Sequence, residues 1–274
     1  MSYQTKKSLG QHFLHSPGII DKILLAIAPR PGDHLIEIGP GAGAITAPLL
    51  SQHKQLTVIE FDRDLIEPLR QMGARLGELQ IVHADILSVD LTELAAGRSI
   101  RLVGNLPYNI SSPILFHAIA HLACIKDMHF MLQKEVVDRM AASPGSKVYG
   151  RLSVMLQARC RVQPLFLVPP GAFNPPPKVD SAVVRLLPHT PDELVILDPR
   201  LFSQLVRAAF AQRRKTLRNA LAELCVEADL TAVGISPGAR AETIAVNKYV
   251  ELSNALHTQG KTVSGNLPPD SDPD

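Results

Sequence analysis

Short apolar segments alternate with amphipathic segments of helical spacing through the first half of this 274-residue chain. Strands are predicted at residues 34–38, 56–60, 79–83, 100–103 and 128–132, and helices at residues 17–28, 42–52, 63–75 and 113–122. Residues 159–168 and 181–187 resemble a strand pair that closes the sheet, separated by a proline-rich loop. Strands that alternate with helices in this way are typical of a doubly wound parallel sheet, so the sequence predicts an α/β fold.

The composition changes near residues 188–199, which predicts a boundary between two domains. Residues 201–257 show helical patterns and no convincing strand. We therefore expect a large domain over residues 1–190 and a small all-helical domain over residues 198–258. Residues 261–274 are polar, acidic and rich in proline, and such a tail is expected to be disordered.

Overall composition excludes several classes of protein. The chain is 46% hydrophobic and 20% charged, with a net charge of only +2, so binding of nucleic acid would have to rest on local clusters. It has no apolar run as long as a membrane span, and its N-terminus lacks the apolar core of a secretory signal. Cys124, Cys160 and Cys225 are widely spaced, which argues against disulfides and zinc. We expect a monomer in the cytoplasm.

A glycine-rich turn, Glu37-Ile38-Gly39-Pro40-Gly41-Ala42-Gly43, connects the first predicted strand to its helix. Glycines at this point allow a ligand to approach the backbone closely and leave access to a helix N-terminus. The turn also satisfies the dinucleotide pattern at Gly39, Gly41 and Ala44, so by itself it leaves a nicotinamide dehydrogenase open.

Two acidic residues follow the next two predicted strands. Glu60 ends the second strand, where a carboxylate can accept both hydroxyls of a ribose, and a dinucleotide enzyme would share this feature. Asp85 follows the third strand, where it can accept from the exocyclic amine of an adenine. Either acid alone could be a solvated surface residue, but acids at successive strand ends favour a nucleoside-bearing cofactor. Together with the glycine turn they resemble a class I methyltransferase that uses S-adenosylmethionine.

The tetrapeptide Asn105-Leu106-Pro107-Tyr108 follows the fourth predicted strand, at the sheet edge where α/β proteins bind ligands. It offers an amide acceptor, a rigid turn and a flat aromatic face, which together suit a planar ring bearing an amine. The tetrapeptide resembles the motif of adenine-N6 methyltransferases. Since a sulfonium is already an activated methyl donor, this chemistry requires neither a metal nor a covalent nucleophile.

Five motifs in order extend the resemblance from about Lys6 to Leu256. They are Gly10-Gln11-His12-Phe13-Leu14, the glycine turn, Val58-Ile59-Glu60-Phe61-Asp62, Gly104 to Ser111, and Phe173-Asn174-Pro175-Pro176-Pro177-Lys178-Val179-Asp180-Ser181. Without the resemblance, the first of these is a polar turn before a helix, with Phe13 and Leu14 packing inward. The set is similar to the bacterial 16S ribosomal RNA adenine-N6,N6-dimethyltransferases, the family in which loss of activity confers kasugamycin resistance. The fold that this implies is a Rossmann-like class I methyltransferase sheet with a small helical domain.

The resemblance implies methylation of N6 in two adjacent adenosines of the 3′-terminal hairpin loop of 16S ribosomal RNA, within the small ribosomal subunit and during ribosome biogenesis. It implies that the residues holding S-adenosylmethionine are His12, Leu14, Gly39, Gly41, Glu60, Asp85 and Asn105. The implied catalytic residues are Asn105, Leu106, Pro107, Tyr108 and Phe173, with Tyr108 and Phe173 on the two faces of the target base. Many relatives carry Asn where this chain has His12.

RNA binding is expected at Arg213-Arg214-Lys215, with Arg207 and Arg218 nearby. Arg207, Arg214 and Arg218 have helical spacing and could present one face to phosphates. Such a run is more often a solvated helix face, and it is the resemblance that favours ribosomal RNA. Lys6 and Lys7 could add contacts.

Two rival functions remain open beside the dehydrogenase. A DNA adenine methyltransferase would share the Asn-Leu-Pro-Tyr site, although the chain shows no extended target-recognition domain. A non-catalytic factor in ribosome assembly could keep the cofactor motifs passively, but the intact Gly39, Glu60, Asp85 and Asn105 argue against it.

Overall fold

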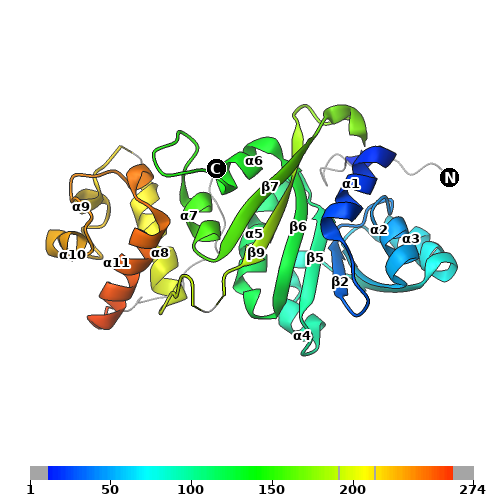
Figure 1. Ribbon diagram of the computed structural model, residues 1–274, viewed down its shortest axis with the longest axis horizontal. Coiled ribbons are helices and arrows are strands. Elements are labelled where there is room, and N and C mark those ends of the chain that lie inside the picture. Colours follow the sequence, from blue (N-terminus) through cyan, green and yellow to red (C-terminus); the bar gives the residue numbers. More distant parts are fainter. Residues whose placement is uncertain (1–11, 191, 213, 262–274) are drawn as a thin grey trace. The chain divides into compact units, whose positions relative to one another are not determined.

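The computed structural model describes residues 12–190, 192–212 and 214–261 (Figure 1). Contacts divide the chain into two compact units, Met1–Val137 with Gln163–Leu187 and Asp138–Val162 with Pro188–Asp274. Residues 138–162, which the sequence analysis assigned to the N-terminal domain, thus group with the C-terminal unit. The boundary between residues 190 and 198 remains a prediction about separately folding domains.

The helices and strands of the two units are numbered in chain order, and Figure 1 labels many of them. The strands are β1 (Phe13–Leu14), β2 (His34–Ile38), β3 (Gln55–Glu60), β4 (Glu78–His83), β5 (Ile100–Asn105), β6 (Ile125–Gln133), β7 (Cys160–Val168), β8 (Phe173–Asn174) and β9 (Ser181–Pro188). The helices are α1 (Pro17–Ile27), α2 (Thr46–His53), α3 (Arg63–Leu76), α4 (Leu91–Ala95), α5 (Ser111–Ala120), α6 (Lys134–Met140), α7 (Arg151–Gln157), α8 (Pro199–Ala211), α9 (Leu217–Ala220), α10 (Glu227–Ala232) and α11 (Val246–Thr258).

Seven strands form one sheet in the order β4-β3-β2-β5-β6-β9-β7. The five strands from β4 to β6 are parallel, because each is reached through a crossover connection, and this confirms the α/β prediction. The predicted strand pair at residues 159–168 and 181–187 closes this sheet as β7 and β9, and β9 pairs with β6 in the antiparallel direction. The order reverses between β2 and β5, which makes the carboxyl ends of these two strands the switch point of the sheet.

Apolar side chains cover both faces of the sheet. Helices α1, α2 and α3 pack with Leu35, Val58 and Val103 in one buried cluster. Ile36 and Leu102 point to the opposite face and are as deeply buried, since successive strand residues alternate between faces. Figure 1 shows α5 behind the sheet on that second side. A strand buried on both faces reads as a continuous apolar run, which is why β2 and β5 could be located from sequence.

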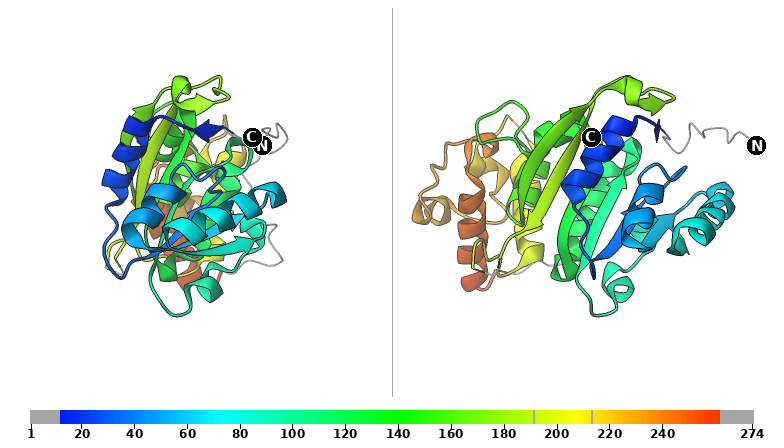
Figure 2. Two further views of the ribbon diagram at one scale, coloured as in Figure 1. Left: turned by 90° about the vertical axis from the view of Figure 1, so that its right-hand side faces the viewer. Right: turned by 45° about the vertical axis from the view of Figure 1, so that its right-hand side comes forward.

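A small second sheet pairs the N-terminal strand β1 with β8, far along the chain. Phe13 lies opposite Asn174 and Leu14 opposite Phe173, in antiparallel register. Figure 2 shows the blue N-terminal strand beside the yellow-green segment that contains β8. The sequence alone suggested a polar turn here, because a two-residue strand is too short to show periodicity. Pairing with β8 sets the position of the backbone around His12.

Helix α2 begins at Thr46, four residues later than the start predicted at residue 42. Residues between Gly41 and Ile45 form turns instead, with the Gly43 amide donating to the Pro40 carbonyl at 2.9 Å. The helical pattern was extended too far toward the N-terminus because Ala42 and Ala44 are compatible with a helix. The longer loop keeps the glycine-rich backbone available at the end of β2.

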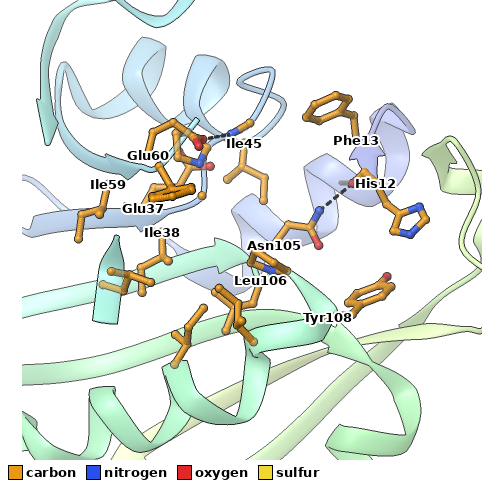
Figure 3. A pocket seen from close by; sticks show the side chains of 18 of the residues that line it. His12, Phe13, Glu37, Ile38, Ile45, Ile59, Glu60, Asn105, Leu106 and Tyr108 are labelled. Atoms are coloured by element: carbon orange, nitrogen blue, oxygen red, sulfur yellow. Dashed lines mark hydrogen bonds between the residues drawn. The ribbon is translucent and has the colours of Figure 1, made fainter. Parts of the chain in front are cut away.

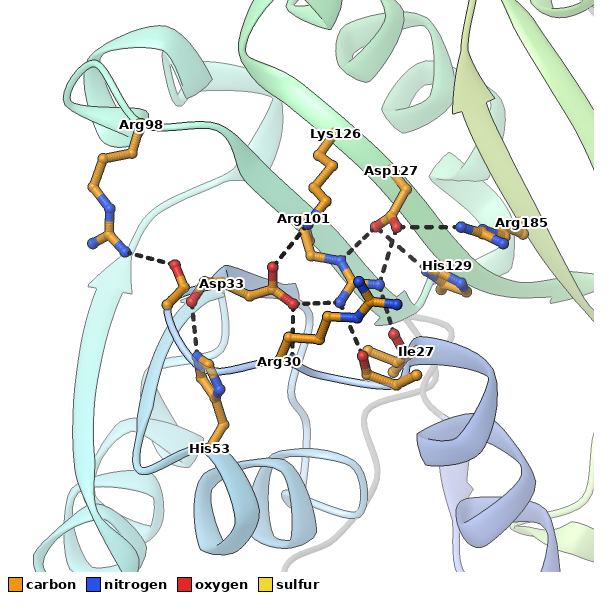
Figure 4. A network of polar contacts seen from close by, with 12 residues as sticks. Ile27, Arg30, Asp33, His53, Arg98, Arg101, Lys126, Asp127, His129 and Arg185 are labelled. Atoms are coloured by element: carbon orange, nitrogen blue, oxygen red, sulfur yellow. Dashed lines mark hydrogen bonds and ion pairs between the residues drawn. The ribbon is translucent and has the colours of Figure 1, made fainter.

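A buried ion network ties the amino ends of β2, β5 and β6 together (Figure 4). The Arg101 guanidinium donates to both carboxylate oxygens of Asp127, at 2.8 and 3.0 Å, and to Oδ2 of Asp33 at 2.6 Å. It also donates to the Ile27 carbonyl at the end of α1 at 2.6 Å. Burial alone would raise the pKa of Asp33, but hydrogen bonds from the Arg30 amide, Lys126 and Arg101 lower it to about 2.

The second unit is built from helices around buried aromatic residues. The ring of Phe210 on α8 meets Tyr149 at 6.1 Å and Tyr249 of α11 at 5.9 Å. The Tyr249 hydroxyl donates to the Ala241 carbonyl at 2.8 Å, so this buried polar group is satisfied. Within the described part of residues 201–257 the structure has helices, turns and one isolated bridge, as the sequence predicted.

Candidate cofactor and active site

A cavity of about 300 Å³ opens at the carboxyl ends of β2, β3 and β5, at the switch point of the sheet (Figure 3). Most of the residues that the sequence analysis singled out line it. These are His12, Leu14, Gly39, Gly41, Glu60, Asp85, Asn105, Leu106, Pro107 and Tyr108. The ends of β2, β3, β4 and β5 therefore meet in one site, as expected for parallel strands, and the segment around β1 adds His12 and Leu14 from more than ninety positions before Asn105.

The glycine loop forms one wall of this cavity. Gly39 has a φ of +65°, a left-handed conformation that disfavours other residues. Its amide donates to the Ile59 carbonyl at 2.9 Å, which fixes the loop to the end of β3. Gly41 lies against Phe13, so closely that a Cβ atom at position 41 would be 3.0 Å from Cε1 of the ring. The loop backbone is thus exposed to a ligand on one side and packed on the other.

Glu60 is buried at the end of β3 and is held by two backbone amides. Its Oε1 accepts from the Asp62 amide at 2.7 Å and its Oε2 from the Gly41 amide at 3.2 Å. Burial raises the pKa of Glu60, while these two amides act in the opposite direction because they favour the charged form. The carboxylate is therefore fixed in orientation toward the cavity, as a ribose-binding group requires.

Glu37 is a cavity residue to which the sequence analysis gave no role. Its side chain is 1% exposed, and its Oε2 accepts from the Thr46 hydroxyl at 2.7 Å. Burial raises the pKa of Glu37 to about 8; the bond from Thr46 lowers it and the nearby charge of Glu60 raises it. An acidic residue in an otherwise apolar strand was the signal that could have marked it. Phe61, 60% exposed, is a second lining residue that was overlooked.

Asp85 stands on the cavity wall after β4. Its Oδ1 accepts from the Leu87 amide at 3.0 Å and so caps the short helical turn at Ile86–Ser88. This cap orients the carboxylate. The exocyclic amine of an adenine is the kind of donor that such an acceptor binds.

Asn105 is placed at the end of β5 by contacts on both sides. Its Nδ2 donates to the main-chain carbonyl of His12 at 3.1 Å, so its Oδ1 is the atom left to accept from a ligand (Figure 3). The preceding Gly104 packs against β2, where a Cβ would lie only 2.5 Å from the Ile38 carbonyl oxygen. The Leu106 amide donates to the Met131 carbonyl at 3.1 Å. Neighbouring strands therefore fix the backbone of the tetrapeptide.

Tyr108 forms the aromatic side of the cavity. Its hydroxyl shares a 2.6 Å hydrogen bond with Oγ of Ser181, and its ring stacks with the imidazole of His12 at a centroid distance of 5.5 Å. Nδ1 of His12 in turn donates to the Pro175 carbonyl at 2.8 Å. A ring-stacking position beside Asn105 is therefore present, with the His12 side chain resting against it.

Phe173 is not brought to this cavity. Its side chain is 2% exposed and belongs to the core cluster that contains Leu14, its β-sheet partner. A ring buried in that way has no face exposed to a base. Phe173 is therefore not assigned the stacking role on the second face of the target base.

Arg207, Arg214, Lys215 and Arg218 are exposed but do not share one helix. Arg207 lies on α8, which ends at Ala211, and Arg218 lies on α9, which begins at Leu217. The expected single helical face is therefore wrong, because α8 ends at Ala211 and Thr216 forms an isolated bridge with Arg240 before α9 begins. Arg218 also forms a 3.5 Å ion pair with Glu227, while Arg214 and Lys215 lie in the connection. Arg213, Lys6 and Lys7 fall outside the described residues.

A sequence profile of the family described as ribosomal RNA adenine dimethylase matches residues 2–258. The chain belongs to this family. The ribosomal RNA small subunit methyltransferase A of Xanthomonas campestris pv. campestris is 64% identical over 253 residues, which cover 92% of this chain and 97% of the relative. The protein of the same name from Xanthomonas axonopodis pv. citri is 65% identical over 253 residues, which again cover 92% of this chain and 97% of the relative.

Solved structures agree with this assignment of the fold. A dimethyladenosine transferase from Plasmodium falciparum has a TM-score of 0.79 and 27% identity, covering 91% of this chain and 98% of that one. The 23S rRNA methyltransferase ErmE has a TM-score of 0.68 and 25% identity, covering 89% and 99%. The predicted Rossmann-like methyltransferase fold and the predicted family of rRNA adenine dimethylases are thus confirmed.

Membership in the rRNA adenine dimethylase family makes the chain a methyltransferase and removes the nicotinamide dehydrogenase from consideration. Within residues 12–261, apart from 191 and 213, no helix is long and apolar enough to cross a membrane. The same residues contain no group of three His, Cys, Asp or Glu side chains arranged to hold a metal ion.

Proposed function

We propose that this chain transfers methyl groups from S-adenosylmethionine to N6 of two adjacent adenosines in the 3′-terminal hairpin loop of 16S ribosomal RNA. The observation that carries this proposal is the setting of Asn105, whose amide nitrogen is bound by the His12 carbonyl while its oxygen remains for a ligand. The names of the Xanthomonas relatives support the small ribosomal subunit as the substrate.

The cavity residues fit S-adenosylmethionine. Glu60 would accept from the ribose hydroxyls and Asp85 from the adenine amine, while Gly39 and Gly41 would let the methionine part approach the loop backbone. Leu14 and His12 would close the wall on the side of β1. The fit rests on the buried Glu60 carboxylate, which two amides orient before any ligand binds. When bound, the cofactor supplies an electrophilic methyl group on a sulfonium.

Asn105 and Leu106 would prepare the nitrogen that receives this methyl group. The amine of adenine is a poor nucleophile because its lone pair is delocalised into the ring. Acceptance of its hydrogens by Asn105 Oδ1 and the Leu106 carbonyl would favour a pyramidal nitrogen with a localised lone pair. Since Met131 and His12 hold both groups in place, the acceptors need no reorganisation, and positioning and electrostatics supply the rate.

Tyr108 would stack on the target adenine, with Pro107 shaping the turn that presents the ring. The His12 imidazole now lies on Tyr108, so its side chain would move or form the other side of the slot when a base enters. Arg207, Arg213, Arg214, Lys215 and Arg218 would bind phosphates of the rRNA. An enzyme with this substrate would act in the cytoplasm, and we expect it to act as a monomer without a metal.

The decisive experiment incubates the protein with S-adenosylmethionine labelled in its methyl group and with small ribosomal subunits that lack base methylation. Digestion and separation of nucleosides should place the label in N6,N6-dimethyladenosine. Asn105→Ala should lower transfer by about 100- to 1000-fold, the usual effect of removing one transition-state hydrogen-bond partner. Full turnover by this variant would refute the role of Asn105.

Two other outcomes of this experiment would favour a different function. Saturable binding to the subunit without label would favour a non-catalytic assembly factor. Label in duplex DNA, offered in competition with the subunit, would instead establish a DNA adenine methyltransferase.

A further inference from the structure

Two acidic side chains face the same cavity from neighbouring parallel strands. Glu37 lies on β2 and Glu60 ends β3, and the two strands are in register at Ile38 and Ile59. The residues are 1% and 6% exposed, so both carboxyl groups lie in a medium that screens charge poorly. A buried pair of like charges is unfavourable unless one group is protonated or a cation binds beside them.

The hydrogen bonds around Glu37 and Glu60 indicate which of the two carboxyl groups is protonated. Glu60 accepts from two backbone amides, which cannot be rearranged and which favour its charged form. Glu37 accepts from one hydroxyl, that of Thr46 on α2. Burial raises the pKa of Glu37 to about 8; the neutral Thr46 on α2 lowers this pKa, and the charge of Glu60 on β3 raises it. The two amides on Glu60, against one hydroxyl on Glu37, place the proton of this pair on Glu37.

The proposed cofactor and its product differ in charge at the reacting atom. S-adenosylmethionine has a sulfonium, whereas the product after methyl transfer has an uncharged thioether, and both carry the same amino group. We propose that Glu37 releases its proton to solvent when the cofactor binds, and that its carboxylate then favours the sulfonium over the neutral product. This inference rests on the proposed function, because it takes the cavity to be the cofactor site.

The proton balance gives the direction of the pH dependence. When S-adenosylmethionine binds to protein in which Glu37 is neutral, one proton is released. A higher pH therefore favours binding of the cofactor. This effect ends at the pH where Glu37 is already ionised in the free protein. Below that point the ratio of cofactor affinity to product affinity should rise by up to about tenfold per pH unit, since only the ionised fraction is competent. The sulfur of the product is uncharged and is not attracted by the Glu37 carboxylate. The affinity for the product should therefore change less with pH than the affinity for the cofactor.

Isothermal titration calorimetry at pH 7, repeated in phosphate and in Tris, measures the protons released on binding. We expect S-adenosylmethionine to release more protons than S-adenosylhomocysteine, by a difference approaching one per site. The shared amino group cancels in this comparison. Glu37→Gln should abolish the difference, and it should make the affinity ratio of the two ligands independent of pH between 6 and 8.

A second variant guards against poor folding of Glu37→Gln. Thr46→Val removes the hydroxyl that favours ionised Glu37, so its cofactor affinity at pH 7 should fall severalfold while product affinity changes little. Equal proton release by both ligands in the unmodified protein, or a difference that persists in Glu37→Gln, would overturn the inference and leave the proposed function intact. Failure of the unmodified protein to bind either ligand would instead count against the proposed function.

Discussion

Replacing Asp33 with Asn should weaken the fold in a way that depends on pH. Asp33 is held by the Arg101 guanidinium at 2.6 Å and by the Lys126 ammonium at 3.0 Å, and its side chain is 7% exposed. Asn has nearly the same shape, so the substitution removes the negative charge and leaves the packing. Arg101 retains its two bonds to Asp127, which keeps the guanidinium paired.

The size of the effect follows from the pKa of Asp33. A carboxyl group whose pKa falls from 3.8 to about 2 on folding adds about 2.4 kcal/mol to the free energy of unfolding at pH 7. Because the folded-state pKa is the lower one, this stabilisation is complete above pH 3.8 and is lost as the pH falls toward 2. The same relation leaves about 1.3 kcal/mol at pH 3.

Urea unfolding of Asp33→Asn and of the unmodified protein, followed by circular dichroism between pH 7 and pH 3, tests this reasoning. The two proteins should differ by about 2 kcal/mol at pH 7 and by roughly half of that at pH 3. Asp21→Asn is the matched control, because Asp21 is exposed on α1 and its loss should change the free energy by less than about 0.5 kcal/mol. A difference that stays constant over this pH range would show that the ion network is not its source.

Three further substitutions test the site and the fold. Gly104→Ala should destabilise the protein by about 1–3 kcal/mol in a thermal unfolding assay and lower methyl transfer, since the new Cβ would lie 2.5 Å from a main-chain oxygen of β2. Gly18→Ala is the control, because Gly18 has open space around it, and this variant should be neutral or stabilising in the same assay. Arg214→Ala with Lys215→Ala should reduce the slope of log affinity for the small subunit against log salt by about 2, measured by filter binding, and an unchanged slope would exclude them as phosphate contacts. Phe173→Leu should cost about 1–2 kcal/mol in stability and leave the KM for RNA unchanged, because the ring is buried; a raised KM would restore its role in base stacking.

The parallel part of the sheet could be predicted because its inner strands β2, β3, β5 and β6 are largely buried on both faces and appear as apolar runs. The residues after β2, β3, β4 and β5 could be assigned to one site because parallel strands end at a common edge. The position of Asn105 at the cavity could be anticipated, but not the carbonyl of His12 that orients it, since that contact joins residues 93 positions apart. The burial of Phe173 in the core could not be predicted, because the sequence of a proline-rich loop does not indicate on which side of the loop an aromatic ring packs.

Glu37 and Arg101 show a second limit of sequence reasoning. Both are ionisable residues inside apolar strands, and the sequence does not say what balances their charge. In the structure Arg101 is balanced by two aspartates from other elements, whereas burial raises the pKa of Glu37 to about 8 and so favours its protonated form. Such pairings depend on strand order, and the order β4-β3-β2-β5-β6 is a tertiary property that local patterns do not encode.

The pairing of β1 with β8 sets an order of events during synthesis of the chain. Phe13 and Leu14 are translated long before Asn174 and Phe173, their partners in the antiparallel pairing of β1 with β8. The glycine loop, Glu60, Asp85 and Asn105 are all translated before β8, so an incomplete chain can hold every one of them without the wall that β1 provides. A nascent chain that ends before β8 is thus unable to complete the cavity wall that β1 provides, whatever the state of the parallel strands.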